Sequence, residues 1–311
     1  MVFSSTVFVF FFLPVCLLLY YLIPGLRAKN TVLLLFTLVF YAWGEPVYIV
    51  LMVLSILLNY WTGLFMERIP SWRRPILIAG IVLDLGLLGF FKYYGFAVEI
   101  LNRIGGLSLE AHRLPLPIGI SFYTFQALSY LIDLYRGKTE AQKDPLLFGL
   151  YISLFPQLIA GPIVRYTEVA ARLRERSVTA ERLGRGMTRF TFGLAKKVLL
   201  ANTLGAIFEE SGLRAGPVST LAAWTGLVAF SLQIYFDFSG YSDMAIGLGR
   251  MFGFKFAENF NYPYIADSVR EFWRRWHISL GTWFRNTSIS RWAATGKVRP
   301  GIFSISCSCG G

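Results

Sequence analysis

Long apolar runs constrain this chain more than any other feature of its sequence. Residues 7–22 contain no charged side chain, and runs of similar character recur along most of the chain. About 20 such residues in a helix cross the ~30 Å hydrocarbon core of a bilayer. Charged residues make up only 15% of the sequence, whereas soluble domains carry about 25%. The sequence therefore predicts an all-α, polytopic membrane protein.

We expect at least seven crossings or re-entrant segments. They are residues 5–24, 30–43, 46–66, 75–96, 115–134 and 145–163, with further apolar helices near 187–209 and 219–236. Pro46 separates the second run from the third, because proline cannot continue a helix and disfavours helical geometry at Glu45 before it. The first run is expected to remain as a span, because no basic segment precedes it and no small-residue cleavage site follows it.

The basic residues are grouped in particular loops. Clusters at 27–29, 68–74 and 136–143 would all face the cytoplasm if the N-terminus lies outside, as the positive-inside rule requires. The net charge of +12 then reflects loops that face anionic headgroups, so we expect membrane lipid as a partner. Nucleic-acid binding is excluded, because it would need a basic face on a soluble module.

Residues 145–163 break this alternation. A full crossing there would put the Arg-rich stretch 165–189 outside, against the positive-inside rule. We therefore expect a re-entrant segment, in which Pro156, Gly161 and Pro162 break the helix where protein or water satisfies the backbone. Residues 165–189 are expected to form an amphipathic cytoplasmic helix on anionic lipid.

A polar run follows the last apolar helix and contains Asp237, Ser239, Tyr241 and Asp243. One interpretation is an interfacial loop in which the two carboxylates cap helices. The other is that the run lines a cavity, because ionisable groups at membrane depth are costly and usually face a pathway or a site.

His277 ends a stretch rich in basic and aromatic residues. On a helix, Arg270, Trp273, Arg274 and His277 would share one side. Neighbouring positive charge favours the neutral imidazole, which can accept a proton as a general base. A lone histidine in such a helix is nevertheless more often an interfacial residue than a catalyst, so both interpretations stay open.

Other candidates carry weaker signals. Asp84 lies within an apolar run, and His112 lies in a short polar loop where we expect it to be solvated. Cys307 and Cys309 have too few neighbouring ligands for a metal site, so we expect no bound metal or cofactor. Walker, dinucleotide-binding and nucleophile-elbow motifs are absent from the sequence.

Several stretches resemble the membrane-bound O-acyltransferase family, most closely its alginate O-acetyltransferase branch. In family order they are Met1–Ser5, Phe40–Trp43, Leu116–Tyr123, Phe155–Pro162, Tyr235–Gly249 and Glu271–Leu280. The resemblance implies a ring of tilted transmembrane helices with re-entrant segments around a central funnel. An acyl donor from the cytoplasm would meet a hydroxyl acceptor there.

The resemblance also implies roles for the residues above. His277 matches the first of two polar positions at the family's reaction centre, as a secondary base or an orienting group. Arg274 and Trp276 would shape the site. The residues that would line the acceptor path are Asp237, Ser239, Tyr241 and Asp243.

The reaction implied by the resemblance is transfer of an acetyl or other short acyl group to hydroxyls of an exported polysaccharide such as alginate. The co-substrate would be acetyl-CoA or an acyl carrier. The setting would be the bacterial inner membrane, with periplasmic acetyltransferases as partners. A transporter or flippase and a non-catalytic structural subunit stay open as alternatives, although a transporter would favour inverted repeats, which the sequence does not show.

The family's main catalytic histidine belongs to a Leu-Trp-His-Gly motif that this chain does not contain. After Asn286 the family continues with residues like Tyr-Val-Tyr-Ile-Pro-Leu-Gly-Gly-Asn-Arg. The nucleotides that encode residues 287–296 allow codons for that run when they are read one base later. We therefore expect residues 1–286 to be a partial family domain and residues 287–311 to be an out-of-frame, disordered tail. The chain as given is expected to be inactive.

Overall fold

The computed structural model describes residues 2–105, 115–159, 161–214 and 216–289. Over these ranges the chain is helical and forms no strand, which confirms the predicted all-α fold. The longer helices are α2 (Leu26–Gly44), α3 (Tyr48–Arg68), α4 (Arg73–Gly105), α5 (Ile120–Tyr135), α9 (Ala180–Ala195) and α11 (Thr220–Met251). The shorter ones are α1 (Leu13–Leu22), α6 (Pro145–Ser153), α7 (Phe155–Leu158), α8 (Tyr166–Arg174), α10 (Asn202–Glu210), α12 (Val269–Arg275) and α13 (Ile278–Phe284).

Three of the described helices are long and apolar enough to cross a membrane. They are Tyr48–Arg68, Pro70–Gly105 and Thr220–Met251, and Phe8–Leu22 forms a shorter apolar helix. The helix predicted at 219–236 is therefore longer than expected, because it continues through the polar residues that follow it.

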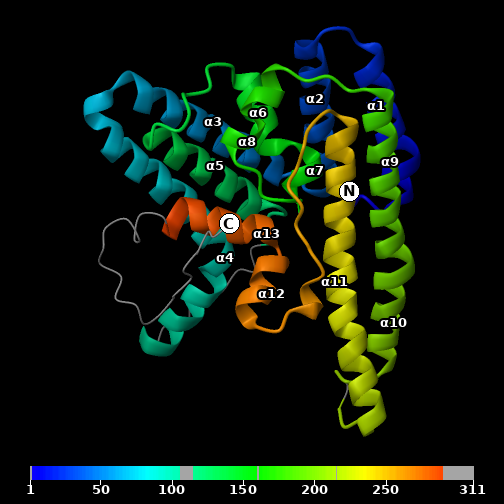
Figure 1. The fold of residues 1–311 in the computed structure, drawn as a ribbon. Helices are drawn as coiled ribbons and strands as arrows, with labels where there is room; N and C mark the ends of the chain where they lie inside the picture. The colour runs from blue at the N-terminus through cyan, green and yellow to red at the C-terminus, as the bar shows by residue number, and fades with distance from the viewer. Residues whose placement is uncertain (1, 106–114, 160, 215, 290–311) are drawn as a thin grey trace, which may run out of the picture.

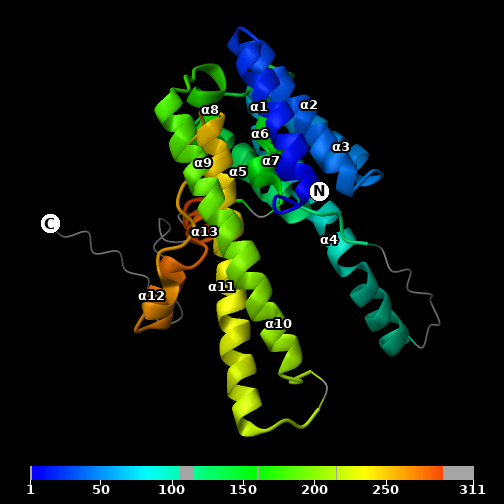
Figure 2. The same ribbon diagram turned by 90° about the vertical axis from the view of Figure 1, so that its right-hand side faces the viewer.

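Two groups of helices make up the described fold (Figures 1 and 2). α9, a π-helical turn at Lys196–Ala201 and α10 form one nearly continuous rod, which runs antiparallel to α11. The helices up to α8 form the other group, which lies beside the upper part of this pair except for α4, whose end extends downward and away from it. Contacts of α7 with both α2 and α11 join the two groups.

Glycines allow α9 and α11 to approach until their backbones touch. A Cβ atom on Gly193 would lie 2.6 Å from the carbonyl oxygen of Gly240, and one on Gly247 would lie 2.6 Å from the nitrogen of Phe190. Small residues at such contacts let membrane helices pack closely through van der Waals forces. The second half of α9 is thereby fixed against the second half of α11.

An aromatic core joins the beginning of the chain to the interior helices. The ring of Phe155 lies 5.6 Å from that of Phe12 and 5.5 Å from that of Phe40, measured between centroids. Phe3 is fully buried and stacks on Tyr241 of α11 at 4.6 Å. The predicted site residue Tyr241 therefore has a packing role in this core.

Residues 145–163 begin and end at the same end of the fold, as predicted for a re-entrant segment. α6 stops at Ser153 because Leu154 leaves helical geometry, and α7 adds a single turn. The buried side chains flanking the segment are in contact, since Gln142 Nε2 donates a hydrogen bond to Tyr166 Oη at 2.8 Å.

The single helix expected over 165–189 does not form. α8 ends at Arg174, the chain becomes extended at Glu175, and α9 starts after Thr179, whose hydroxyl accepts a hydrogen bond from the Arg182 backbone. The break is held by Arg176, whose Nε donates to Tyr20 Oη and to the Phe252 carbonyl, both at 3.0 Å. Anchoring to α1 and to the end of α11 thus overrides the helical pattern.

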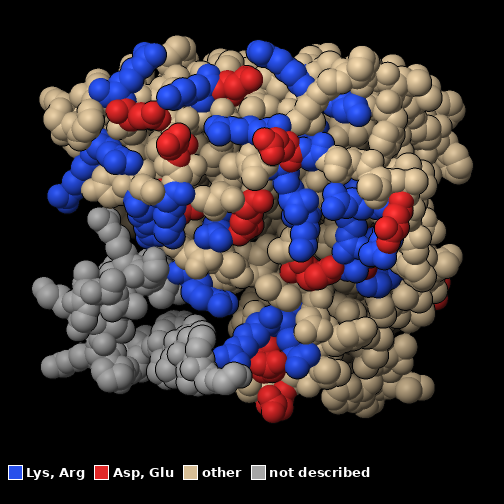
Figure 3. All heavy atoms as spheres, turned by 45° about the horizontal axis from the view of Figure 1, so that its top comes forward, with Lys and Arg blue, Asp and Glu red and all other residues tan. Residues whose placement is uncertain are grey.

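The basic loops assigned to one side by the positive-inside rule do lie at one end of the fold. Arg27 Nη2 is 4.0 Å from a carboxylate oxygen of Asp144, and Lys143 Nζ is 3.6 Å from one of Glu67. Asn30 Nδ2 donates to the carbonyl of Leu173 at 3.0 Å, which brings the Arg-rich stretch to the same end. Figure 3 shows many Lys and Arg side chains across this face, with acidic side chains between them.

Candidate functional site

His277 lies in the turn between α12 and α13, and not on a helix as the sequence suggested. Its φ of 45° places it in the left-handed region, where a non-glycine residue is uncommon. α12 ends at Arg275, and after the extended Trp276 the left-handed His277 is the N-cap residue of α13. Arg270, Trp273 and Arg274 therefore do not form a shared helical face with His277. The conformation is held by contacts to a distant segment.

Asn259 provides those contacts. Its Oδ1 atom lies 3.1 Å from His277 Nδ1, and it accepts hydrogen bonds from the Ser279 backbone N–H at 3.1 Å and from Ser279 Oγ at 2.9 Å. The Asn259 carbonyl also accepts the Ile278 N–H at 3.0 Å. Because Asn259 is 1% exposed, these bonds are shielded from water. One residue thus fixes both the backbone and the ring of the turn.

Ser279 extends this network to the re-entrant segment. Its hydroxyl oxygen accepts a hydrogen bond from the backbone N–H of Ile163 at 3.0 Å. Nearby, Trp283 Nε1 donates to the carbonyl of Phe125 at 3.0 Å. The turn carrying His277 is therefore tied to α5 and to the end of the re-entrant segment.

Burial lowers the pKa of His277 to about 4. The sequence predicted a neutral imidazole, and the structure supports that state for a different reason. Desolvation of the ring is the main cause, whereas the sequence argument relied on neighbouring cations. The ring packs edge-on against Phe238 of α11, with 4.9 Å between centroids. At neutral pH this imidazole can accept a hydrogen bond or a proton.

Trp276 lies in an aromatic cluster beside the histidine. Its ring is 5.0 Å from Phe260 and stacks on Phe272 at 5.5 Å. Arg274 is more exposed, and its Nη1 atom is 3.7 Å from a carboxylate oxygen of Glu271. Trp276 therefore supports the turn through packing, while Arg274 lies toward the surface of the described residues.

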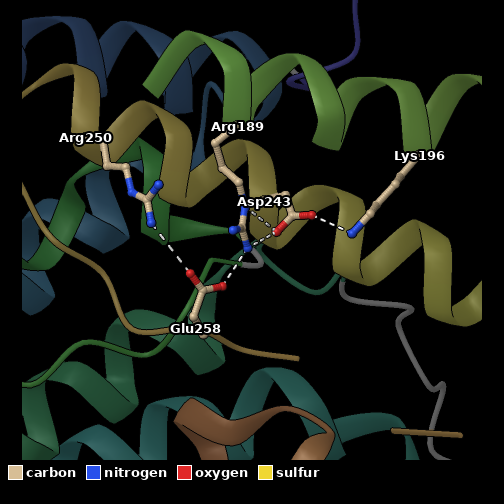
Figure 4. Close-up of polar contacts among 5 residues, drawn as sticks. All are labelled: Arg189, Lys196, Asp243, Arg250 and Glu258. Atoms are coloured by element: carbon tan, nitrogen blue, oxygen red, sulfur yellow. Dashed lines mark hydrogen bonds and ion pairs between the residues drawn. The ribbon is translucent and has the colours of Figure 1, made fainter. Parts of the chain in front are cut away.

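Asp243 lies inside α11 and not in a loop, so neither it nor Asp237 caps a helix as one interpretation proposed. Its carboxylate accepts hydrogen bonds from Arg189 Nε at 2.8 Å, Arg189 Nη2 at 2.5 Å and Lys196 Nζ at 2.6 Å. Arg189 Nη2 also donates to Glu258 at 2.5 Å, and Figure 4 shows its guanidinium between the two carboxylates. Arg250 Nη2 lies 3.6 Å from the other oxygen of Glu258.

This ion-pair network holds the segment that carries the histidine's partner. Glu258 directly precedes Asn259, so the bonds from Arg189 and Arg250 fix the backbone next to the hydrogen-bonding hub. Asp237 pairs with Lys197 at 2.7 Å, and Ser239 is 2% exposed. The role of the run along an acceptor path stays a prediction.

Sequence reasoning missed Asn259, Ser279 and Arg189. Asn259 is 18 residues from His277, and no motif spacing links them. Ser279 lies within the matched stretch Glu271–Leu280, so its position two residues after the histidine was the available signal.

Asp84, one of the weaker candidates, is buried and accepts a hydrogen bond from Asn59 Nδ2 at 2.9 Å.

Three weaker candidates lie outside the described residues: His112, Cys307 and Cys309. Most of the predicted tail, residues 290–311, lies outside them too. Within the described ranges, no group of three His, Cys, Asp or Glu side chains is placed to hold a metal ion.

The fold and this site define a helical, multi-pass membrane protein with a partly buried neutral histidine. Residues 140–286 match the model of the MBOAT family, the membrane-bound O-acyltransferases, and the chain belongs to this family. That matched range includes Asn259, His277 and the Asp243 network.

Relatives of known name extend the match over most of the chain. A probable alginate O-acetylase AlgI of Pseudomonas aeruginosa is 48% identical over 293 residues, which cover 92% of this chain and 56% of that protein. The peptidoglycan O-acetyltransferase of Helicobacter pylori is 36% identical, covering 92% of this chain and 60% of that protein. A teichoic acid D-alanyltransferase of Bacillus subtilis is 28% identical over 178 residues, covering 56% of this chain and 45% of that protein. The chain thus spans little more than half the length of these alginate and peptidoglycan relatives.

Proposed function

We propose that the protein to which this chain corresponds transfers an acetyl or other short acyl group to hydroxyls of an exported polysaccharide. The observation that supports this most directly is a partly buried, neutral histidine on a fixed turn inside the family-matched range. The names of the relatives add that O-acetylation of alginate and of peptidoglycan occurs among similar proteins. Alginate or a similar polymer is the proposed acceptor.

In this reaction the acceptor oxygen attacks the acyl carbonyl and forms the new ester C–O bond. The hydroxyl proton passes to a base, and the bond between the acyl group and its carrier breaks. With a thioester donor, such as acetyl-CoA or an acyl carrier, the departing thiolate takes up a proton. A histidine that is neutral at pH 7 meets the basic requirement for holding or accepting the hydroxyl proton.

His277 is proposed as a secondary base or an orienting group for the acceptor hydroxyl. Trp276 supports the turn, and the polar run of α11 is proposed to line the acceptor path. The basic end of the fold is proposed to face the cytoplasm and anionic headgroups of a bacterial inner membrane. Periplasmic acetyltransferases are proposed as partners of the complete assembly.

Residues 287–311 are proposed to be translated out of frame. The match to the family ends at residue 286, which supports this proposal. Sequencing the locus past codon 286 tests it directly. An in-frame continuation without a Leu-Trp-His-Gly motif would instead favour a transporter or a non-catalytic structural subunit.

Acetylation of the polymer in cells tests the proposed function. A host lacking its own alginate O-acetylase would express either this chain or a form that continues in the shifted frame after codon 286. Only the second form is expected to restore acetyl groups on the polymer. Restoration by neither form, at normal membrane abundance, would contradict the proposed reaction.

Variants of His277 in the active form separate its roles. His277→Ala is expected to lower turnover by roughly 10²-fold at equal abundance, the usual scale for losing a positioned acid–base group. His277→Gln keeps hydrogen-bonding capacity without basicity, so partial rescue is expected for an orienting group. Full activity of His277→Ala would remove this residue from the site.

A further inference from the structure

The hydrogen bonds around Asn259 determine which of its two side-chain atoms faces the histidine. The backbone N–H of Ser279 points at this atom from 3.1 Å, and a backbone N–H can only donate. The atom must therefore be the amide oxygen, because an NH2 group there would place two donors against each other. The Asn259 amide has no freedom to turn over.

The proton of the Ser279 hydroxyl is fixed in the same way. Ser279 Oγ is 2.9 Å from Asn259 Oδ1 and 3.4 Å from His277 Nδ1. One of its two lone pairs accepts the N–H of Ile163. The shorter contact to a full acceptor takes the hydroxyl proton, so Ser279 is a donor to Asn259.

His277 then has one arrangement that satisfies its neighbours. Nδ1 lies 3.1 Å from an oxygen that can only accept, so Nδ1 must carry a hydrogen. If Nδ1 were unprotonated, two acceptor atoms would face each other inside a buried network. In the neutral ring the other nitrogen, Nε2, then holds the free lone pair. The ring's contacts with the side chains of Asn259 and Ser279 are both at Nδ1, so Nε2 is the nitrogen left for a ligand.

We propose that Asn259 is a positioning residue that locks His277 in the Nδ1–H tautomer and presents the Nε2 lone pair to the acceptor hydroxyl. The assignment of the hydroxyl as ligand rests on the proposed function, whereas the tautomer rests on geometry alone. Asn259 does not itself touch the reacting atoms. It acts by fixing the ring's orientation and the identity of its basic nitrogen, as partners of metal-binding and catalytic histidines do.

Nitrogen NMR of the chain tests the tautomer without any need for activity. The chain contains only two histidines, so His112→Gln leaves His277 as the sole signal in a sample labelled with 15N-histidine in lipid nanodiscs. We expect a protonated Nδ1 and an unprotonated Nε2 at pH 7. A protonated Nε2, or protons on both nitrogens at that pH, would overturn the proposal in the unmutated site itself.

Asn259→Ala and Asn261→Ala form a matched pair for the role of the amide. Asn261 belongs to the same segment, but it is exposed, and it bonds to Arg275 through its backbone N–H and carbonyl. Asn259→Ala is expected to lose the single Nδ1–H tautomer and give a mixture, whereas Asn261→Ala is expected to keep it. An unchanged tautomer in a folded Asn259→Ala protein would refute the positioning role.

The second measurement is acyl transfer by the longer form, which continues in the shifted frame after codon 286. If the proposed function is correct, Asn259→Ala should lower turnover by roughly 10-fold or more with little change in KM for the polymer, because the basic nitrogen is misplaced while the acceptor path is intact. If His277 has the Nδ1–H tautomer but the unmutated longer form transfers no acyl group, the proposed function is contradicted and the tautomer assignment is not. If the unmutated protein has the Nδ1–H tautomer but Asn259→Ala keeps full activity, the positioning role of Asn259 is contradicted.

Discussion

Asp243→Asn is expected to destabilise the pairing of α9 with α11. The substitution keeps the shape of the side chain but removes its charge. The carboxylate is 9% exposed and accepts three hydrogen bonds from Arg189 and Lys196 at 2.5–2.8 Å. Removing one partner of a buried ion pair costs about 3–5 kcal/mol, because the other charge is left uncompensated.

The expected cost here is smaller, at about 2 kcal/mol. Arg189 and Lys196 are 31% and 33% exposed, so water can resolvate both cations in part. Arg189 also keeps its bond to Glu258. Lys196 loses its charged partner, and the asparagine can still accept a hydrogen bond.

Asp237→Asn is the matched control on the same helix. Asp237 is 43% exposed and makes one ion pair, with Lys197, so its loss is expected to cost less than about 1 kcal/mol. The free energy of unfolding would be measured by titrating mixed micelles with SDS and following tryptophan fluorescence. If Asp243→Asn lies within 0.5 kcal/mol of the unmutated chain, a margin well below the ~2 kcal/mol expected here, or if Asp237→Asn costs as much, the network does not hold the helices together.

Three further predictions concern pH, helix contact and topology. Burial lowers the pKa of His277 to about 4, so the unfolded state binds more protons than the folded state between about pH 6.5 and 4. The free energy of unfolding should therefore fall by up to about 3 kcal/mol as the pH drops through this window. In His277→Gln the free energy of unfolding should depend less on pH. Gly193→Ala should lower the free energy of unfolding by about 1–3 kcal/mol, because its Cβ would meet α11 backbone atoms at 2.6 Å. Gly184→Ala, which has open space around it on α9, should leave stability unchanged or raise it. Equal effects of the two substitutions would contradict the close contact. A cysteine at Arg174 should resist an impermeant reagent in intact cells and react after lysis; labelling in intact cells would place the Arg-rich end outside.

Much of the helical fold could be predicted from apolar pattern and charge. Residues 48–68 and 73–105 form helices where long apolar runs indicated them. The same-side return of residues 145–163 followed from the arginines after it, because one more crossing would have placed them outside. The structure shows that return in the contact between Gln142 and Tyr166.

The periodic pattern failed where distant contacts decide the backbone. Residues 165–189 were expected to form one helix, but Arg176 bonds to Tyr20 and to the carbonyl of Phe252, and the chain breaks there. One of the two interpretations of the polar run after residue 236 made it an interfacial loop, but Asp243 has cationic partners on α9 and in the π-helical turn, and α11 continues to Met251. Because the charge of Asp243 is paired inside the fold, the helix does not end where the polar residues begin.

The sequence by itself determined that the chain is a helical membrane protein of the acyltransferase family, because apolar length, basic loops and family motifs are local properties of the residue order. It also identified His277 as a candidate. Only the tertiary structure decided the environment of that histidine. The turn at His277, the buried amide of Asn259 and the hydroxyl of Ser279 meet across 18 to 20 residues of chain. Hydrogen-bond partners, burial and hence pKa depend on such meetings in space, which no spacing along the sequence records.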